Sequence, residues 1–481
     1  MKTNIINSPK VIQERKRLDK NNIFKEFVLD ESYKDLGKDK TYYLYTYGCQ
    51  GNESDSEKIR GLLEEMSFTI TYDLSKADLI LMNTCAIRKN AEDKVFGELG
   101  RLKQLKRKNP NLIIGLSGCM AQEESVINKL LTKYQNVDFI FGTHNIDSLP
   151  KILYNTMSNK ERYVDVLSYE GDIVENIPIV RESNIKAWVP IMYGCDEFCT
   201  YCIVPYTRGK ERSRLKENII KEVEGLIKEG YKEITLLGQN VNAYGKDFVG
   251  IKYDFGDLLN DLSKLSIERI RFTTNNPKDF DDKQIEAIKN SSNIMPSIHL
   301  PVQSGSNKVL HKMNRKYTKE EFISLVDKIY KEIPNVSITT DIIVGFPSET
   351  EEDFKETLEL FKRCNFEGAY TFIFSKREGT PAYSYIDESI TEEVQYDRLY
   401  RLNELVNEGY KRGNLRFKDK IVKVLIEGTS KNQPDTLMGY TENNKLVNVK
   451  GDSKYIGKIV NVKIVDAKTW SLDGEIIDDQ N

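Results

Sequence analysis

The chain has 481 residues, which allows about three domains at roughly 150 residues each. Its 71 basic and 74 acidic residues leave a formal net charge of −3, so no global positive field attracts nucleic acid, although a local patch can. The mean hydropathy is −0.52, and no apolar run approaches the roughly 18 residues of a membrane-spanning helix. Because the charged first forty residues lack a secretory signal, we expect a cytoplasmic protein whose grouped cysteines are metal ligands rather than disulfides.

Between residues 41 and 143 one pattern repeats: a short apolar run, a cysteine, and an amphipathic charged run. Each repeat predicts a βα unit. The expected strands are Tyr42–Tyr47, Asp78–Met82, Leu112–Leu116 and Val137–Gly142, and the first three are followed directly by Cys49, Cys85 and Cys119. Because parallel strands end at one edge of their sheet, we expect these three thiols to converge on one site. The alternative is that each cysteine is an ordinary small core residue.

Residues 151 to about 183 are polar and are expected to form a linker with one strand. A second series of apolar runs follows, with charged helical runs such as Lys216–Glu229 between them. The expected strands are Trp188–Tyr193, Glu233–Leu237, Ile270–Thr273, Ser297–Leu300, Ser337–Val344 and Ala369–Phe374. Six βα units in series predict a doubly wound sheet or an incomplete barrel, with function at the carboxyl ends of the strands.

A second cysteine triplet, Cys195, Cys199 and Cys202, directly follows the first of these six strands. One loop with this spacing can wrap three irons of a cubane cluster and leave the fourth iron without a protein ligand. Three thiolates per site leave one position open for a substrate or cofactor, so the two triplets indicate chemistry at metals. A zinc site is the alternative, but it requires a fourth ligand, and the nearest histidine in sequence, His144, lies in the preceding domain.

The C-x3-C-x2-C spacing, with Tyr201 before the last cysteine, resembles the signature of radical S-adenosylmethionine (SAM) enzymes. In that family the open iron chelates SAM, and an electron from the cluster cleaves SAM to a deoxyadenosyl radical. The resemblance implies that Tyr201 lies near the SAM adenine and that Gln239 and Asn240 lie at the SAM amino group. It also implies that Gln303 and Ser304 contact the ribose. The Gly345 motif (residues 342–350) is expected to pack against the adenine. The alternative for this motif is a plain strand–turn–helix junction in which Ser348 caps the next helix.

From about residue 414 the chain changes to short alternating strands separated by Gly, Asn and Asp turns. Ile421–Glu427, Lys445–Lys450 and Lys458–Ala467 predict a small all-β barrel, which resembles the TRAM domain of RNA-modifying enzymes. The alternative is a structural cap without a ligand. Six basic residues near its start are candidates for phosphate contacts: Lys411, Arg412, Arg416, Lys418, Lys420 and Lys423.

The order of these parts, over residues 41–477, resembles the methylthiotransferase family. The expected fold is multidomain α/β: an N-terminal extension (1–40), a doubly wound parallel-sheet domain with an auxiliary cluster (41–157), a partial (β/α)6 barrel radical SAM domain (181–411) and an all-β TRAM barrel (414–477). The family implies two 4Fe-4S clusters: one SAM methylates sulfur on the auxiliary cluster, and a second SAM generates the radical that abstracts hydrogen from the substrate carbon. We expect no catalytic acid or base, because the radical takes a hydrogen atom rather than a proton.

Finer strings resemble the MiaB group, which acts on tRNA that carries N6-isopentenyladenosine beside the anticodon. These strings are residues 46–50, 83–88, 192–209 and 236–244. Gly51 is a departure, because the family usually has methionine at this position. The resemblance implies tRNA as a partner, an electron donor such as a flavodoxin or ferredoxin, no membrane, and a monomer. Arg208, Lys210, Arg212 and Arg214 are candidates for RNA phosphates, with internal salt bridges or a solvated face as the alternative.

Two rival functions remain open from the sequence. A sister methylthiotransferase acts on threonylcarbamoyladenosine in tRNA or on an aspartate of a ribosomal protein, and its cysteine geometry is the same. A non-enzymatic iron–sulfur redox sensor is the other rival, although electron carriers normally close their clusters with four ligands. Reductive cleavage of SAM distinguishes an enzyme from a sensor.

Overall fold

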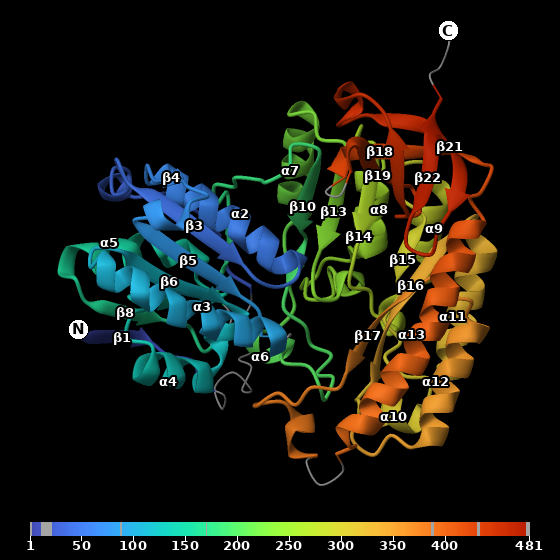
Figure 1. Ribbon diagram of the computed structural model, residues 1–481, viewed down its shortest axis with the longest axis horizontal. Helices are drawn as coiled ribbons and strands as arrows, with labels where there is room; N and C mark the ends of the chain where they lie inside the picture. Colours follow the sequence, from blue (N-terminus) through green and yellow to red (C-terminus); the bar gives the residue numbers. More distant parts are fainter. Residues whose placement is uncertain are drawn as a thin grey trace. The chain divides into compact units, whose positions relative to one another are not determined.

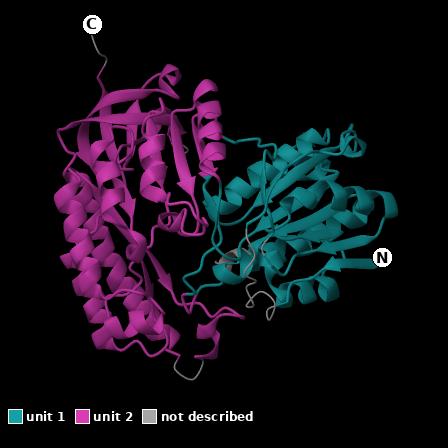
Figure 2. Cartoon of the chain, turned by 180° about the vertical axis from the view of Figure 1, so that it is seen from behind, with its two compact units in different colours: residues 1–182, 190–198, 202–214 teal, residues 183–189, 199–201, 215–481 magenta. Residues whose placement is uncertain are grey.

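The computed structural model describes residues 2–10, 22–86, 89–169, 171–385, 389–430 and 433–477. Ile87 and Arg88, which end one of the family-like strings, lie outside the described residues. The chain forms two compact units (Figure 2). Unit 1 comprises residues 1–182, 190–198 and 202–214, and unit 2 comprises residues 183–189, 199–201 and 215–481.

Unit 1 contains a seven-stranded parallel sheet with the order β1-β8-β7-β6-β5-β3-β4 (Figure 1). The four predicted strands are present within two residues of their expected bounds. The strands of this sheet are β1 (Thr3–Asn7), β3 (Thr41–Thr46), β4 (Thr69–Ile70), β5 (Leu79–Thr84), β6 (Ile113–Gly118), β7 (Phe139–Phe141) and β8 (Arg162–Asp165). The prediction of a linker from residue 151 is wrong, because helix α5 (Leu149–Asn159) begins with Pro150 in its first turn and packs Ile152 and Leu153 into the core.

Helices cover both faces of this sheet, as expected for parallel strands. Alternate residues of β5 point to opposite faces: Leu79 and Leu81 pack with α2 (Gln50–Glu65) and α5, whereas Ile80 and Met82 pack with α3 (Lys89–Lys108) and α4 (Glu124–Lys133). The doubly wound parallel sheet that the sequence predicts is therefore confirmed. Outside this sheet, β2 (Phe24–Glu26) pairs with β9 (Ile173–Glu175).

Unit 2 contains six strands in two three-stranded sheets with the orders β10-β13-β14 and β15-β16-β17. The strands are β10 (Lys186–Pro190), β13 (Glu233–Leu237), β14 (Arg269–Phe272), β15 (Ser297–His299), β16 (Ser337–Val344) and β17 (Ala369–Ile373). Helices follow them as α7 (Lys216–Lys228), α8 (Phe255–Leu262), α9 (Asp282–Asn290), α10 (Asn307–Lys312), α11 (Lys319–Glu332), α12 (Glu351–Arg363) and α13 (Glu392–Leu415) (Figure 1). This is the predicted partial barrel.

The expected strand Trp188–Tyr193 is interrupted. β10 ends at Pro190, which has no N–H to donate to the sheet, and a short β11 (Met192–Tyr193) pairs instead with β12 (Arg212–Ser213) in antiparallel fashion. The β11–β12 pair and the short helix α6 (Val204–Thr207) belong to unit 1.

The C-terminal segment forms a closed barrel in the order β18-β19-β20-β22-β21, which confirms the predicted all-β barrel. Its strands are β18 (Ile421–Ser430), β19 (Gln433–Thr441), β20 (Leu446–Lys450), β21 (Ile459–Ala467) and β22 (Leu472–Ile476). Within unit 2, two buried arginines of β14 fix this barrel, because Arg269 donates to the carbonyl of Tyr440 at 2.8 Å and Arg271 to that of Thr441 at 2.8 Å. In the described part of the chain, no helix is both long and apolar enough to cross a membrane.

Candidate functional site

The structure brings Cys49, Cys85 and Cys119 together at one edge of the unit 1 sheet. They follow β3, β5 and β6, which are adjacent parallel strands. Their proximity is visible in two ways: a Cβ atom on Gly48 would lie 2.9 Å from the Cβ of Cys85, and the thiols of Cys85 and Cys49 both act on the pKa of Cys119. The sequence prediction that strand order would gather these cysteines therefore agrees with the fold.

Glycines let the backbone turn sharply into two of these cysteines. Gly48 and Gly118 have φ values of 146° and 96°, which L side chains rarely adopt. A Cβ atom on Gly118 would also collide with the carbonyl oxygen of Thr84. Both positions therefore require glycine.

One buried ion pair lies against this cysteine group. Arg208, which follows α6, donates from Nε to Cys119 Sγ at 3.2 Å and from Nη2 to Asp55 Oδ2 at 2.7 Å. Burial raises the pKa of Cys119 to about 12, against the opposing effect of Arg208. Burial by itself lowers the pKa of Arg208, but Asp55 and the thiols outweigh it and raise that pKa above its usual range. The guanidinium thus remains charged beside the thiols.

The donor set fits an iron–sulfur cluster better than a single ion. None of the seven cysteines, all of which lie in the described ranges, forms a disulfide. Within the described ranges, no three His, Cys, Asp or Glu side chains are arranged to hold one metal ion. In a cubane cluster each thiolate binds a different iron, so the thiols are spaced more widely than around one ion. Soft thiolates without histidine or carboxylate donors suit iron–sulfur chemistry.

The second cysteine triplet begins at a turn between β11 and β12. Gly194 has φ 75°, and a Cβ atom there would collide with the carbonyl oxygen of Lys210. The amide of Cys195 donates to the carbonyl of Gly209 at 3.1 Å, which fixes the start of the loop. The position before Cys195 therefore requires glycine, as do the positions before Cys49 and Cys119 in the first group.

Cys199, in unit 2, contacts a half-buried arginine that the sequence did not reveal. Arg315, which follows α10, donates from Nη1 to Cys199 Sγ at 3.3 Å. Its other nitrogens reach the hydroxyl of Tyr317 at 2.8 Å and the carbonyl of Pro301 at 3.1 Å. No sequence motif identifies Arg315, because its partner precedes it by 116 residues.

The residues expected to contact SAM lie at the carboxyl ends of the unit 2 strands. After β13, Asn240 is 1% exposed and donates to Asp279 at 2.7 Å, while its Oδ1 has no partner in the described structure. An acceptor left open in this way fits an ammonium group. Asn275, after β14, also has an Oδ1 without a partner in the described structure. The sequence analysis did not name Asn275 as a site residue, although its position at a strand end could have indicated this role. Gln239 is half-buried.

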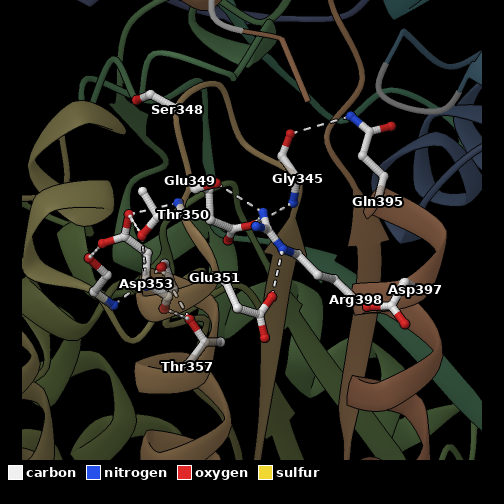
Figure 3. A network of polar contacts seen from close by, with 12 residues as sticks. Gly345, Ser348, Glu349, Thr350, Glu351, Asp353, Thr357, Gln395, Asp397 and Arg398 are labelled. Carbon is white, nitrogen blue, oxygen red and sulfur yellow. Dashed lines mark hydrogen bonds and ion pairs between the residues drawn. The ribbon is translucent and has the colours of Figure 1, made fainter. Parts of the chain in front are cut away.

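The fifth-strand motif forms a fixed turn around Gly345, which has φ 71° (Figure 3). The amide of Gly345 donates to Glu349 at 2.8 Å, and Arg398 donates to the same carboxylate at 2.7 Å. The next helix, α12, is capped by Thr350 rather than by Ser348, because Thr350 accepts from the amide of Asp353. Phe346 belongs to a buried apolar cluster against which Tyr201 packs, so two of the expected adenine contacts lie in one region of unit 2.

The neighbouring loop after β15 holds Gln303 and Ser304, both buried. Gln303 adopts φ 75°, and its backbone bonds to Asp341 and Ile343 of β16. The hydroxyl of Ser304 lies 3.4 Å from that of Thr357. Backbone and side-chain bonds to β16 and α12 therefore fix this loop.

One face of β15, β16 and β17 combines a polar pair with exposed aromatic rings. His299 contacts Thr339 at 3.0 Å and Asp341 at 3.2 Å. Tyr370, in register with Asp341, is 61% exposed, and Phe372 is 40% exposed. An exposed aromatic pair beside hydrogen-bonding groups can stack and orient a planar base.

Three of the four arginine and lysine residues expected to bind RNA are buried within unit 1. Arg208 pairs with Asp55, Arg212 donates to the carbonyl of Gly171, and Arg214 makes bonds of 2.6 and 2.9 Å to the carboxylate of Glu175. These internal contacts match the alternative of internal salt bridges for Arg208 and Arg214, and a contact of the three guanidinium groups with tRNA phosphates stays a prediction. Lys210 is half-buried and its RNA contact stays a prediction.

Three family models match this chain: the Radical SAM superfamily over residues 189–361, the Uncharacterized protein family UPF0004 over residues 41–142, and the TRAM domain over residues 416–477. Two full-length relatives are named tRNA-2-methylthio-N(6)-dimethylallyladenosine synthase. The one from Bacillus cytotoxicus is 57% identical over 95% of this chain and 90% of its own length, and the one from Bacillus subtilis is 57% identical over 94% and 89%.

A solved structure supports the fold. It is the radical SAM methyltransferase TsrM from Kitasatospora setae, solved with cobalamin and a [4Fe-4S] cluster bound. It matches with a TM-score of 0.53 at 12% identity, over 71% of this chain and 76% of the solved chain.

Proposed function

This chain belongs to the family of tRNA-2-methylthio-N(6)-dimethylallyladenosine synthases, and from its two cysteine sites we propose how it carries out that family's reaction. It is a radical SAM methylthiotransferase that uses SAM and two 4Fe-4S clusters. We propose that its substrate is the N6-isopentenyladenosine beside the anticodon of tRNA, which becomes the 2-methylthio derivative.

The presence of two groups of three cysteines in one chain, none of them in a disulfide, carries the proposal. An iron–sulfur electron carrier needs one cluster closed by four ligands, whereas two open clusters suit one site that activates a cofactor and one that presents sulfur. We propose that Cys195, Cys199 and Cys202 hold the cluster that activates SAM, and that Cys49, Cys85 and Cys119 hold the auxiliary cluster.

When bound, SAM and the clusters supply the radical, the methyl group and the sulfur. The chain's own residues bind and orient SAM. Oδ1 of Asn240 is the acceptor that we assign to the SAM ammonium group, since burial leaves it no partner in the described structure. Tyr201 and the Gly345 turn provide an apolar wall with fixed backbone for the adenine. Because hydrogen leaves the substrate as an atom, no side chain is required to remove a proton from the reacting carbon.

For the substrate base we assign the face formed by His299, Asp341, Tyr370 and Phe372. The exposed rings offer a stacking surface, and the histidine–aspartate pair offers a donor and an acceptor to a base edge. We further propose that the TRAM barrel contributes phosphate contacts and that a flavodoxin- or ferredoxin-class protein supplies electrons.

The test is anaerobic reconstitution with iron and sulfide, followed by reaction with SAM, dithionite and tRNA bearing isopentenyladenosine, with nucleosides read by mass spectrometry. We expect one methylthio group per modified nucleoside, abolished separately by Cys49→Ala and by Cys199→Ala. Deoxyadenosine without this product would redirect the assignment to the sister substrates. No SAM cleavage with both clusters intact would favour a redox sensor.

A further inference from the structure

Each three-cysteine site has an arginine that donates a hydrogen bond to one of its thiols; Arg208 is buried and Arg315 is half-buried. In unit 1, Nε of Arg208 lies 3.2 Å from Cys119 Sγ. In unit 2, Nη1 of Arg315 lies 3.3 Å from Cys199 Sγ. The two arginines come from different segments of the chain, so the shared geometry reflects the two sites and not a repeated motif.

The charge around the two arginines differs. Asp55 neutralises Arg208 at 2.7 Å, and both side chains are 8% exposed. The partners of Arg315 are the hydroxyl of Tyr317, the carbonyl of Pro301 and Cys199, and no carboxylate of the described chain is among its hydrogen-bond or ion-pair contacts. A direct contact with a carboxylate therefore compensates the charge of Arg208, whereas no such contact compensates that of Arg315 among the described contacts.

We propose that Arg208 and Arg315 set the reduction potentials of the two clusters, each acting on the cluster bound by the cysteine that it contacts. This inference rests on the cluster assignment of the proposed function. One-electron reduction makes a cluster more negative, and no bond to arginine forms or breaks. An N–H donor and a positive charge beside a thiolate stabilise the reduced state and raise the potential. Burial of Arg208 and partial burial of Arg315 strengthen this effect, because the surrounding protein reduces screening by water.

The charge difference gives the two sites distinct responses. Arg315→Gln removes an uncompensated charge, so it is expected to lower the potential of the SAM-activating cluster more than Arg208→Gln lowers that of the auxiliary cluster. Asp55→Asn leaves Arg208 uncompensated, so it is expected to shift the auxiliary cluster in the opposite direction, to a higher potential. A purely structural role for these residues predicts no such reversal of sign.

The experiment is a redox titration of the full chain followed by electron paramagnetic resonance. Two triple variants assign the signals: alanine at Cys49, Cys85 and Cys119 leaves the SAM-activating cluster, and alanine at Cys195, Cys199 and Cys202 leaves the auxiliary cluster. For Arg315→Gln we expect at least a tenfold fall in the ratio of reduced to oxidised cluster at a fixed solution potential, which is 59 mV for one electron. Arg315→Lys keeps the charge and is expected to restore part of the shift.

Matched controls are Arg214→Gln in unit 1 and Arg271→Gln in unit 2. Both arginines are buried and paired with a carboxylate, and neither has a hydrogen bond or ion pair with a cysteine among the described contacts. Their loss is expected to leave both potentials unchanged. If Arg315→Gln fails to bind iron, Arg315→Lys and Asp55→Asn still test the proposal.

Unchanged potentials in iron-loaded Arg315→Gln and Asp55→Asn would overturn the inference, as would equal shifts in both clusters. The outcome is separable from that of the proposed function. Shifted potentials without a methylthiolated nucleoside would preserve this inference and refute the substrate. Failure of the unaltered chain to bind iron would refute the cluster assignment and, with it, this inference.

Discussion

The two cysteine sites differ in how the chain builds them. The site in unit 1 takes one cysteine from each of three adjacent strands, at separations of 36 and 34 residues, whereas the other triplet falls within eight residues of one loop. In the first site the cysteines are far apart in sequence, and the spacing of about 4.8 Å between neighbouring strands brings them together. The first site therefore depends on the whole sheet, and the second depends on a local turn. Both sites nevertheless contain a step in which a glycine with positive φ precedes a cysteine: Gly48 and Gly118 in the first site, and Gly194 in the second.

The largest effect is expected when that shared step is changed. Gly118→Ala places a Cβ atom against the carbonyl of Thr84 at φ 96°, so unit 1 should lose about 3 kcal/mol or more and its auxiliary cluster should not load. Gly194→Ala places a Cβ atom against the carbonyl of Lys210, so the cluster at Cys195, Cys199 and Cys202 should not load. Iron per chain, measured in the two triple-alanine backgrounds, separates the two losses.

Gly97→Ala is the matched control, because no described atom beyond its chain neighbours and the nearby backbone of α3 lies within 4 Å of its added Cβ. It should stabilise the helix by about 0.5–1 kcal/mol and leave both clusters intact. If Gly118→Ala bound iron at both sites and unfolded like the unaltered chain, the glycine–cysteine step would have no role in building the first site.

Sequence patterns revealed the cysteines and most of the scaffold, because both follow local periodicity. The bounds of β13 and β16 agree with prediction residue for residue. β1 was missed, because the Asn residues at its ends obscure its short apolar run, and residues 151–183 contain two strands, β8 and β9, where one was expected. Arg208 was assigned to RNA because it lies in a basic run, and only the fold shows Asp55 beside it, 153 residues earlier. The partner of a buried charge can lie far away in the sequence, so local sequence patterns do not identify it.

A second comparison concerns one buried glutamate in each unit. Burial is the main cause that raises the pKa of Glu57 in unit 1 and of Glu349 in unit 2 to about 7, despite nearby arginines. The folded state therefore holds each proton more tightly than the unfolded chain, whose carboxyls titrate near 4.5. The stability from this source is complete below about pH 4.5 and is lost as the pH rises through about 7. Each carboxyl contributes at most about 3 kcal/mol, from about 1.36 kcal/mol per pKa unit.

Glu349→Gln should remove this pH dependence from unit 2, and Glu57→Gln should remove it from unit 1 only. Both tryptophans, Trp188 and Trp470, belong to unit 2, so their fluorescence in urea at pH 5 to 8 reports the unfolding of that unit. We expect a flatter profile for Glu349→Gln and an unchanged profile for Glu57→Gln. Equal flattening by both variants would mean that the units unfold together.

The smallest effect is expected at Gly51, the second residue of α2, beside the same cysteines as Gly118. Here an added Cβ would lie 3.5 Å from Cys49 Sγ and 3.6 Å from Arg208 Nη2, which are ordinary van der Waals distances, and φ is not positive. Gly51→Ala should therefore raise stability by about 0.5 kcal/mol, because alanine restricts the unfolded chain and suits a helix. It should also slow the loss of auxiliary-cluster iron in air by covering Cys49.

The same substitution at Gly118 and Gly51 thus has opposite signs around one cluster. The difference lies in the backbone: Gly118 ends a strand in left-handed conformation against a neighbouring carbonyl, whereas Gly51 is already within a helix and has space in front of it. Urea unfolding of the two variants side by side measures this contrast. A loss of stability in Gly51→Ala comparable to that in Gly118→Ala would show that the whole edge of the sheet is intolerant, and that the tightness at Gly118 is not specific to its turn.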